Sequence, residues 1–251
     1  MIVDLLHRIQ RKWMKLRLQP IRVFCFHHVS EVRDPLQCQV DDWTQLDQFK
    51  RNIEKLSSKY TFISLQKACD ILKHDTIRWR HYAVLTTDDG LASVLNITSW
   101  LEENRIPLMI FVNTRYMERD SLKPIHKDWL LKLDPKADMQ LIAQEMYLSK
   151  QQVWKLNSPY IEIGLHGHEH LNVQKISSVA FESEISKCVE VLHLHPRYLA
   201  AYAYPWGNAT EESLAYLRKS NIIPVLIDNQ RNYKWTSCIH RECIDNKDID
   251  L

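Results

Sequence analysis

Short apolar runs alternate with longer segments of helical periodicity along almost the whole chain. This alternation is typical of parallel strands joined by crossover helices, so it predicts an α/β fold. Seven runs predict strands, which is a barrel-like number: residues 21–26, 61–63, 82–87, 108–112, 160–165, 199–204 and 222–227. Helices are predicted between them over residues 43–59, 65–73, 91–104, 178–194 and 210–220, and a final strand over residues 236–244.

The length of 251 residues suits one barrel domain. Residues 126–157 are charged and contain only Pro135 as a helix breaker. They predict an insertion of two or three helices between the fourth and fifth strands, forming a lid or wall beside a site. We therefore expect an N-terminal helix over residues 1–19 and a single domain over residues 20–251.

Charge and cysteine content exclude several classes of function. Thirty-three Lys and Arg residues against 31 Asp and Glu residues leave a net charge of +2, too small to indicate a nucleic-acid partner. The six cysteines form no CxxC pair, which favours reduced thiols over a disulfide framework. No apolar run is long enough for a transmembrane helix, and no secretory signal is present. A cytoplasmic protein is therefore expected.

The N-terminal segment has the pattern of an amphipathic basic helix. One interpretation is that it packs on the surface of its own domain. The other is that residues 2–18 make a peripheral contact with a membrane, so that the protein is membrane-associated. The apolar positions are Ile2, Leu5, Leu6, Ile9, Trp13 and Leu16, and the basic positions are Arg8, Arg11, Lys12, Lys15 and Arg17.

Glycine is scarce, and each glycine lies beside chemically capable side chains. Ordinary usage predicts about 17 glycines in a chain of this length, whereas only four occur. Since glycine permits positive φ angles and close backbone approach, these positions direct attention to three motifs. The glycines are Gly90, Gly164, Gly167 and Gly207.

Two adjacent carboxylates, Asp88 and Asp89, follow the apolar run 82–87 and precede Gly90. They therefore lie at the carboxyl end of a strand, where parallel α/β folds form their sites. Neighbouring like charges are stable if a cation neutralises one of them or a proton binds one. Alternatively, one of them caps a helix that begins near Leu91.

Three of the 12 histidines lie within five residues, at the end of another predicted strand. This density favours a metal site. The pair His166 and His170, four residues apart, is the preferred ligand pair, with His168 as the competitor and solvated loop histidines as the alternative. Two histidines and one carboxylate leave coordination positions for water and a substrate oxygen, which predicts hydrolysis of an acyl compound. One aspartate then binds the metal while its neighbour accepts a proton from water.

These motifs resemble those of the polysaccharide deacetylases with NodB homology, carbohydrate esterase family 4. Thr86–Gly90 matches the family motif T-F-D-D-G, with Thr87 in place of phenylalanine. The resemblance implies a distorted (β/α)7-type barrel of parallel strands with outer helices. It also implies that Asp88 is the general base, and that Asp89 and the H-x-x-x-H pair His166 and His170 bind the metal.

The segment from Ala203 to Gly207 resembles the family motif R-P-P-Y-G. The resemblance gives the backbone N–H of Trp206 a role in binding the oxyanion, with Tyr204 and Pro205 beside it at the substrate. Ala203 replaces the arginine that orients the base in this family. Arg241 is the candidate to take over this role at Asp88.

The run from Phe26 to Val29 resembles the Y-H-x-V run of the circularly permuted branch that contains poly-N-acetylglucosamine deacetylases. This resemblance implies that His27 is the general acid. His28 and His240 are the alternatives.

Together these features predict a hydrolase with one divalent metal ion, Zn²⁺, that removes N-acetyl groups from an amino-sugar-containing glycan or glycan precursor. Its partner is then an acetylated amino-sugar substrate. Two alternatives remain. One is a catalytically inactive sugar-binding relative, which Thr87 and Ala203 would permit. The other is a metal-dependent amidase or deformylase acting on a small or lipid-linked acylated sugar.

Overall fold

The computed structural model describes residues 19–249, except residues 40, 75–77 and 79. The candidate membrane contact over residues 2–18, and almost all of the helix predicted over residues 1–19, lie outside the described residues. Among the helices of the described part, none has both the length and the apolar character needed to cross a membrane.

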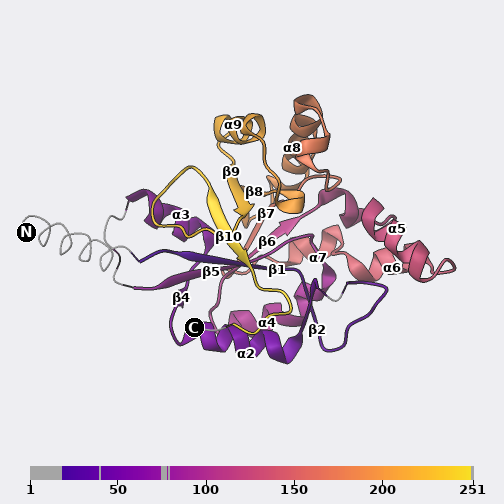
Figure 1. The fold of residues 1–251 in the computed structure, drawn as a ribbon, viewed down its shortest axis with the longest axis horizontal. Helices are drawn as coiled ribbons and strands as arrows, with labels where there is room; N and C mark the ends of the chain where they lie inside the picture. Colours follow the sequence, from indigo (N-terminus) through magenta and orange to yellow (C-terminus); the bar gives the residue numbers. More distant parts are fainter. Residues whose placement is uncertain (1–18, 40, 75–77, 79, 250–251) are drawn as a thin grey trace, which may run out of the picture.

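Seven parallel strands form a closed barrel, as the sequence predicts (Figure 1). Their order around the barrel is β1-β10-β9-β8-β7-β6-β5, and β5 pairs with β1 to close it. Because every pairing in this ring is parallel, all seven strands end at the same rim. The strands are β1 (Arg22–Phe26), β5 (Tyr82–Thr87), β6 (Leu108–Val112), β7 (Ile161–Leu165), β8 (Tyr198–Ala203), β9 (Ile223–Ile227) and β10 (Ile239–Cys243).

The membership of the ring differs from the prediction at one strand. The run predicted over residues 61–63 forms only the two-residue strand β4 (Thr61–Phe62), which pairs with the start of β5 and stays outside the ring. The predicted final strand, observed as β10, completes the barrel instead. Two short strands were also missed: β2 (His28–Ser30) pairs with β3 (Trp43–Gln45), and β3 occupies the start of the helix predicted over residues 43–59.

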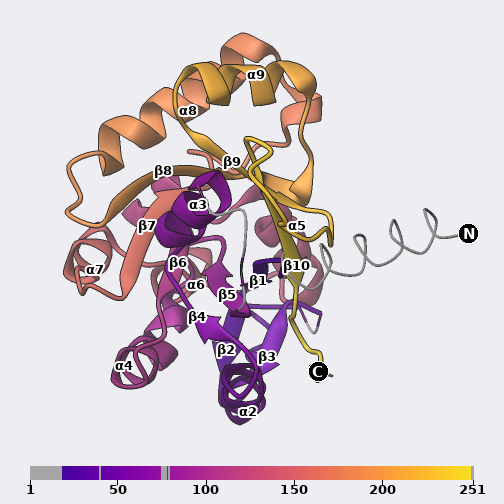
Figure 2. The ribbon, with the colours of Figure 1, turned by 90° about the vertical axis from the view of Figure 1, so that its left-hand side faces the viewer.

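Helices surround the strands on their outer side (Figure 2). In that view α8 and α9 cover one side of the barrel, whereas α2 and α4 lie at the opposite side. Three further helices fill the chain between β6 and β7. The helices are α2 (Leu46–Ser57), α3 (Leu65–His74), α4 (Leu95–Glu103), α5 (Pro124–Leu133), α6 (Met139–Met146), α7 (Lys150–Lys155), α8 (Ser178–Leu192) and α9 (Glu211–Lys219).

Helix α3 packs against the residues that fill the inside of the barrel. Its Leu65, Ala68 and Leu72 belong to the same buried cluster as Val84 and Phe111 from the strands. The buried Glu162 carboxylate at the amino end of β7 accepts hydrogen bonds from the backbone N–H groups of Leu65 (2.7 Å) and Gln66 (3.2 Å). Since the first N–H groups of a helix have no partner within the helix, Glu162 fixes α3 at the amino ends of the strands. The opposite rim stays available for a site.

Gly164 in β7 is required by the packing inside the barrel. A Cβ atom at this position would overlap Met109 Cε and would lie 2.9 Å from ring atoms of Phe111. The same face of β7 carries Glu162 and His166, because side chains alternate along a strand. The missing side chain at Gly164 thus lets the strand approach its neighbour while His166 faces inward.

Candidate active site

The predicted site residues meet at the carboxyl ends of the barrel strands, around a cavity of about 500 Å³. Asp88 and Asp89 follow β5, His166 and His170 follow β7, and His27 follows β1. All five line this cavity. Five residues from three different segments therefore converge because the parallel strands end at one rim. Helix α5 contributes Ile125, His126 and Trp129 to the wall.

Asp89, His166 and His170 have the geometry of a metal-binding group. Asp89 Oδ1 lies 3.3 Å from His166 Nε2 and 3.2 Å from His170 Nε2. His166 Nδ1 lies 2.9 Å from the carbonyl oxygen of Ala203, which can only accept, so Nδ1 carries the proton and Nε2 offers its lone pair to the cavity. Two imidazole nitrogens and one carboxylate oxygen are a suitable ligand set for a divalent ion such as Zn²⁺.

The electrostatic environment keeps His170 and Asp89 in the protonation states that a metal needs. Burial, together with the nearby positive charge of Lys123, lowers the pKa of His170 to about 3, so the imidazole is neutral. Burial acts to raise the pKa of Asp89, but the charge of Lys123 holds that pKa well below the usual value. Neutral imidazoles and an ionised carboxylate are the forms that bind metals.

Sequence reasoning missed Lys123, which lies against this group. Its ammonium forms an ion pair with Asp89 Oδ1, and its side chain is only 1% exposed. Lys123 directly precedes α5 and lies 34 residues from Asp89 along the chain. Only the path of the loop between β6 and α5 brings the two together, so no local sequence pattern marks this lysine.

Asp88 is held by Arg241, the residue proposed from the sequence to replace the family arginine. Arg241 Nη1 donates to Asp88 Oδ1 at 2.7 Å and Nη2 donates to Oδ2 at 2.8 Å, with both side chains buried. Thr86 Oγ1 accepts a further bond from Nη1 at 3.0 Å. Burial acts to raise the pKa of the Asp88 carboxyl, but the charge of Arg241 and its hydrogen bonds to the carboxylate hold the pKa well below its ordinary value. Asp88 is therefore an oriented carboxylate that is ionised at neutral pH.

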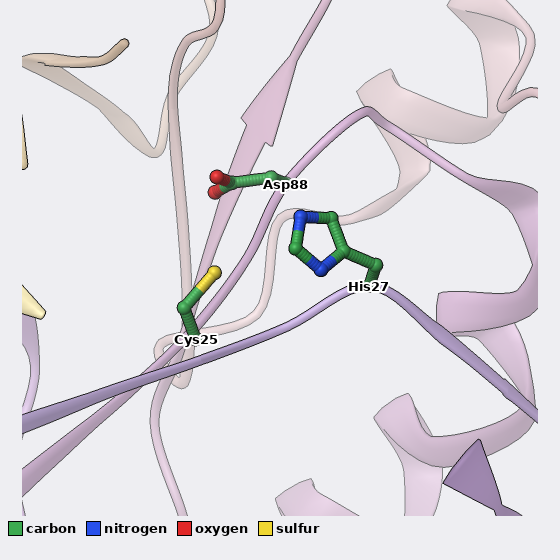
Figure 3. A group of neighbouring side chains, drawn as sticks. All are labelled: Cys25, His27 and Asp88. Atoms are coloured by element: carbon green, nitrogen blue, oxygen red, sulfur yellow. The ribbon is translucent and has the colours of Figure 1, made fainter. Parts of the chain in front are cut away.

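His27 is paired with a carboxylate that the sequence did not reveal. Its Nδ1–H donates to Asp245 Oδ2 at 2.6 Å, and its backbone N–H donates to Asp245 Oδ1 at 2.8 Å. Burial acts to lower the pKa of His27, but the charge and hydrogen bond of Asp245 raise it well above the ordinary value. Figure 3 shows His27 near Asp88 and Cys25, and ligand atoms of the three lie within 4.8 Å of one another. Asp245 could have been found by the rule that located Asp88, because it follows the predicted last strand.

The alternative histidines have other surroundings. His28 lines the cavity, but it is buried, its Nδ1 has no hydrogen-bond partner, and burial lowers its pKa to about 4. His240 interacts through Nδ1 with Asp228 at 2.7 Å and lies outside the cavity lining. His168 makes a 2.8 Å hydrogen bond with Thr114 and also lies outside it. Neither His240 nor His168 is placed to reach a group held between Asp88 and His27.

The segment after β8 brings an aromatic side chain to the cavity. Trp206 has a left-handed backbone (φ 65°), is 52% exposed, and its indole N–H donates to the carbonyl oxygen of His170 at 3.3 Å. Tyr204 also borders the cavity, but its hydroxyl lies 3.0 Å from Ser213 Oγ in the core. Pro205 is buried beside Gly167 and is outside the lining.

Asp89 (φ 72°) and His170 (φ 59°) share this left-handed conformation with Trp206. It is uncommon for residues other than glycine and is concentrated at functional sites.

Comparison with known families and structures places these observations in context. A family model described as polysaccharide deacetylase matches residues 78–225, more than half of the chain. No protein of curated function matches.

Solved structures with a similar fold include IcaB from Ammonifex degensii, with 18% identity and a TM-score of 0.71 over 92% of this chain and 94% of that chain. The Streptococcus pyogenes deacetylase PplD has 16% identity and a TM-score of 0.69, over 90% and 93% of the two chains. A de-N-acetylase from Aggregatibacter actinomycetemcomitans has 14% identity and a TM-score of 0.65, over 90% and 95%. At these identities the likeness establishes the fold.

Proposed function

Since the chain belongs to the polysaccharide deacetylase family, whose members are carbohydrate deacetylases, we propose that it removes N-acetyl groups from an amino-sugar-containing glycan or glycan precursor in a metal-dependent hydrolysis. One observation carries this proposal. The group formed by Asp89, His166 and His170 shares a cavity with Asp88 and His27. Arg241 holds the Asp88 carboxylate, and Asp245 holds the His27 ring. A ligand set for a Lewis acid, an ionised base and a protonated acid are the three elements that amide hydrolysis requires.

The metal-binding role belongs to Asp89, His166 and His170 in this proposal. When bound there, a divalent ion such as Zn²⁺ acidifies water and polarises the acetyl carbonyl. Asp88, the neighbour of Asp89 in the chain, accepts the proton of the attacking water. Arg241 orients the Asp88 carboxylate with two hydrogen bonds and keeps it ionised.

The remaining residues protonate the leaving group, stabilise the oxyanion and contact the sugar. His27, kept protonated by Asp245, donates a proton to the departing nitrogen, so that acetate and a free amino sugar are formed. The backbone N–H of Trp206 donates to the oxygen that gains negative charge. The exposed Trp206 indole, with Tyr204 and Pro205 behind it, forms the side of the cavity that contacts the sugar. Of the helices within residues 126–157, α5 walls the cavity, within a single domain over residues 20–251.

The test is acetate release from N-acetylglucosamine oligosaccharides, with metal content measured on the same samples. We expect the wild-type protein to release acetate, Asp88→Asn to retain metal but lose at least a hundredfold in kcat, and Asp89→Asn to lose the metal. His240→Ala is the matched control, because His240 lies outside the cavity, and it should behave as wild type.

Equal activity of wild type and Asp88→Asn would contradict the assignment of the base. Stoichiometric metal without turnover on any acetylated sugar would favour the inactive sugar-binding relative. Turnover confined to formylated, small or lipid-linked substrates would favour the amidase or deformylase.

A further inference from the structure

The ammonium of Lys123 lies at the oxygen of Asp89 that also faces His166 and His170. Lys123 Nζ pairs with Asp89 Oδ1, and this same oxygen lies 3.2 Å from His170 Nε2 and 3.3 Å from His166 Nε2. The lysine ammonium and the two histidines therefore contact the same carboxylate oxygen, Asp89 Oδ1. The mechanism proposed above gives Lys123 no role.

Lys123 is held in this position by the segment around it. Its backbone N–H donates to the Tyr147 hydroxyl at 3.3 Å, and its ammonium lies 5.9 Å from the centre of the Tyr147 ring. The Lys123 carbonyl oxygen accepts from the N–H of Lys127 at 2.9 Å in the first turn of α5. A buried ammonium loses its strong hydration, so the ion pair with Asp89 compensates for a cost that an exposed lysine would not have.

The two adjacent carboxylates each have a cationic partner without an added ion. Arg241 neutralises Asp88, and Lys123 neutralises Asp89. A divalent ion bound by Asp89 would face a buried ammonium paired with the same oxygen. Like charges at such short range repel strongly where water is excluded, so the ammonium and the ion cannot both occupy this side of Asp89 at low cost.

We propose that Lys123 is an internal counter-ion of Asp89 that competes with the divalent ion. It stabilises the metal-free site, and metal binding requires its ammonium to leave Asp89 Oδ1. Lys123 therefore weakens metal affinity and acts as a positioning residue for Asp89 rather than as a catalytic group. This inference rests on the proposed function, because it takes Asp89, His166 and His170 as the metal ligands.

The test measures Zn²⁺ affinity by competition with a chromophoric chelator, on protein stripped of metal by dialysis. Lys123→Met keeps the length and the apolar stem of the side chain but removes the charge, and we expect its Kd for Zn²⁺ to be at least tenfold lower than that of the wild type. Lys123→Gln should change the Kd in the same direction if the methionine variant does not fold. Lys123→Arg keeps the charge and should remain close to wild type.

Lys127→Met is the matched control, because it makes the same charge change one turn further along α5 at an exposed position. Its Kd should stay within about twofold of the wild type, since exposed charges are screened by solvent. A second readout is thermal unfolding: without metal, Lys123→Met should melt at a lower temperature than wild type, and Zn²⁺ should raise its melting temperature by more.

The outcomes separate this inference from the proposed function. If wild type binds Zn²⁺ and the neutral Lys123 variants bind it equally or more weakly, the competition is refuted while the metal site stands. If no variant binds Zn²⁺ more tightly than Asp89→Asn, the metal site and the competition both fail. Binding by Lys123→Met but not by wild type would be the strongest support for the competition.

Discussion

Removing the charge of Arg241 should measure how much the buried Arg241–Asp88 pair contributes to the free energy of unfolding. The Arg241 and Asp88 side chains are 0% and 1% exposed and share two hydrogen bonds of 2.7 and 2.8 Å. In Arg241→Gln the carboxylate stays buried without its counter-charge. Breaking a buried pair by removing one partner costs about 3–5 kcal/mol. That is a large share of the total of about 5–15 kcal/mol that stabilises a typical domain.

The stability lost in Arg241→Gln should depend on pH. The direction of this dependence shows whether the buried, ionised Asp88 carboxylate causes the loss. In the wild type the pKa of Asp88 lies below its unfolded value, so its contribution is complete above that value and is lost as the pH falls through the folded pKa. In Arg241→Gln the strongest influence that lowers the pKa of Asp88 is removed, so burial, the largest single influence, dominates and raises that pKa above the unfolded value of about 3.9. The fold then favours the protonated carboxyl, so the variant loses stability as the pH rises. Its deficit relative to wild type should be larger at pH 8 than at pH 5.

Urea unfolding followed by circular dichroism at both pH values measures this. Arg22→Gln is the matched control. Arg22 on β1 pairs with Glu242 on β10, the strand that also carries Arg241, and it does so through two bonds (2.9 and 2.7 Å), but both side chains are partly exposed. Arg22→Gln should lose about 1 kcal/mol or less of the free energy of unfolding. The double variant Asp88→Asn with Arg241→Gln should recover most of the deficit. A loss below about 1 kcal/mol for Arg241→Gln, or a deficit equal at both pH values, would refute the reasoning.

Three further changes test other parts of the site and the fold. Asp245→Asn should lower the pKa of His27, because Asp245 is the group that raises it. Since the protonated acid is the active form, the basic limb of the pH profile of kcat/KM should move to lower pH. A basic limb that stays in place would exclude His27 as the acid. Gly164→Ala should cost about 1–3 kcal/mol in thermal unfolding through overlap with Met109 and Phe111, and an unchanged melting temperature would show that the interior has room. Treatment with a chelator should abolish acetate release and Zn²⁺ should restore it in wild type but not in Asp89→Asn, whereas activity that survives complete removal of metal would contradict metal dependence.

The strands were predictable where burial dominates their sequences. Residues 82–87 and 108–112 are observed as strands with the predicted bounds because their side chains are almost all buried. The order around the ring was not predictable in the same way. Strand β10 carries Arg241 and Glu242 and therefore lacks an uninterrupted apolar run, yet it closes the barrel. The run at residues 61–63 has β-forming residues, but only two of them pair.

The site was predictable to the extent that it lies at strand ends. Asp88, Asp89, His166 and His170 follow strands that were recognised, and parallel strands bring their ends together whatever the loops do. Lys123 reaches the cavity only through the path of a loop, and the pairing of Asp245 with His27 depends on the closure of the barrel between β10 and β1. The strand-end rule could have placed Asp245 at this rim, but no local pattern predicts that it pairs with His27 or that Lys123 reaches Asp89.

The two adjacent carboxylates illustrate how the structure resolves a conflict that is visible in the sequence. Either a proton or a cation has to relieve the repulsion between Asp88 and Asp89. Asp88 continues the direction of β5 and meets Arg241, whereas Asp89, with a φ of 72°, turns toward His166, His170 and Lys123. Each carboxylate thus has its own cation, and both remain ionised. The two cations differ in kind. Asp88 is paired with a buried arginine on β10, whereas Asp89 is paired with a lysine that directly precedes α5. In the competition that we propose, it is the lysine that a metal ion displaces.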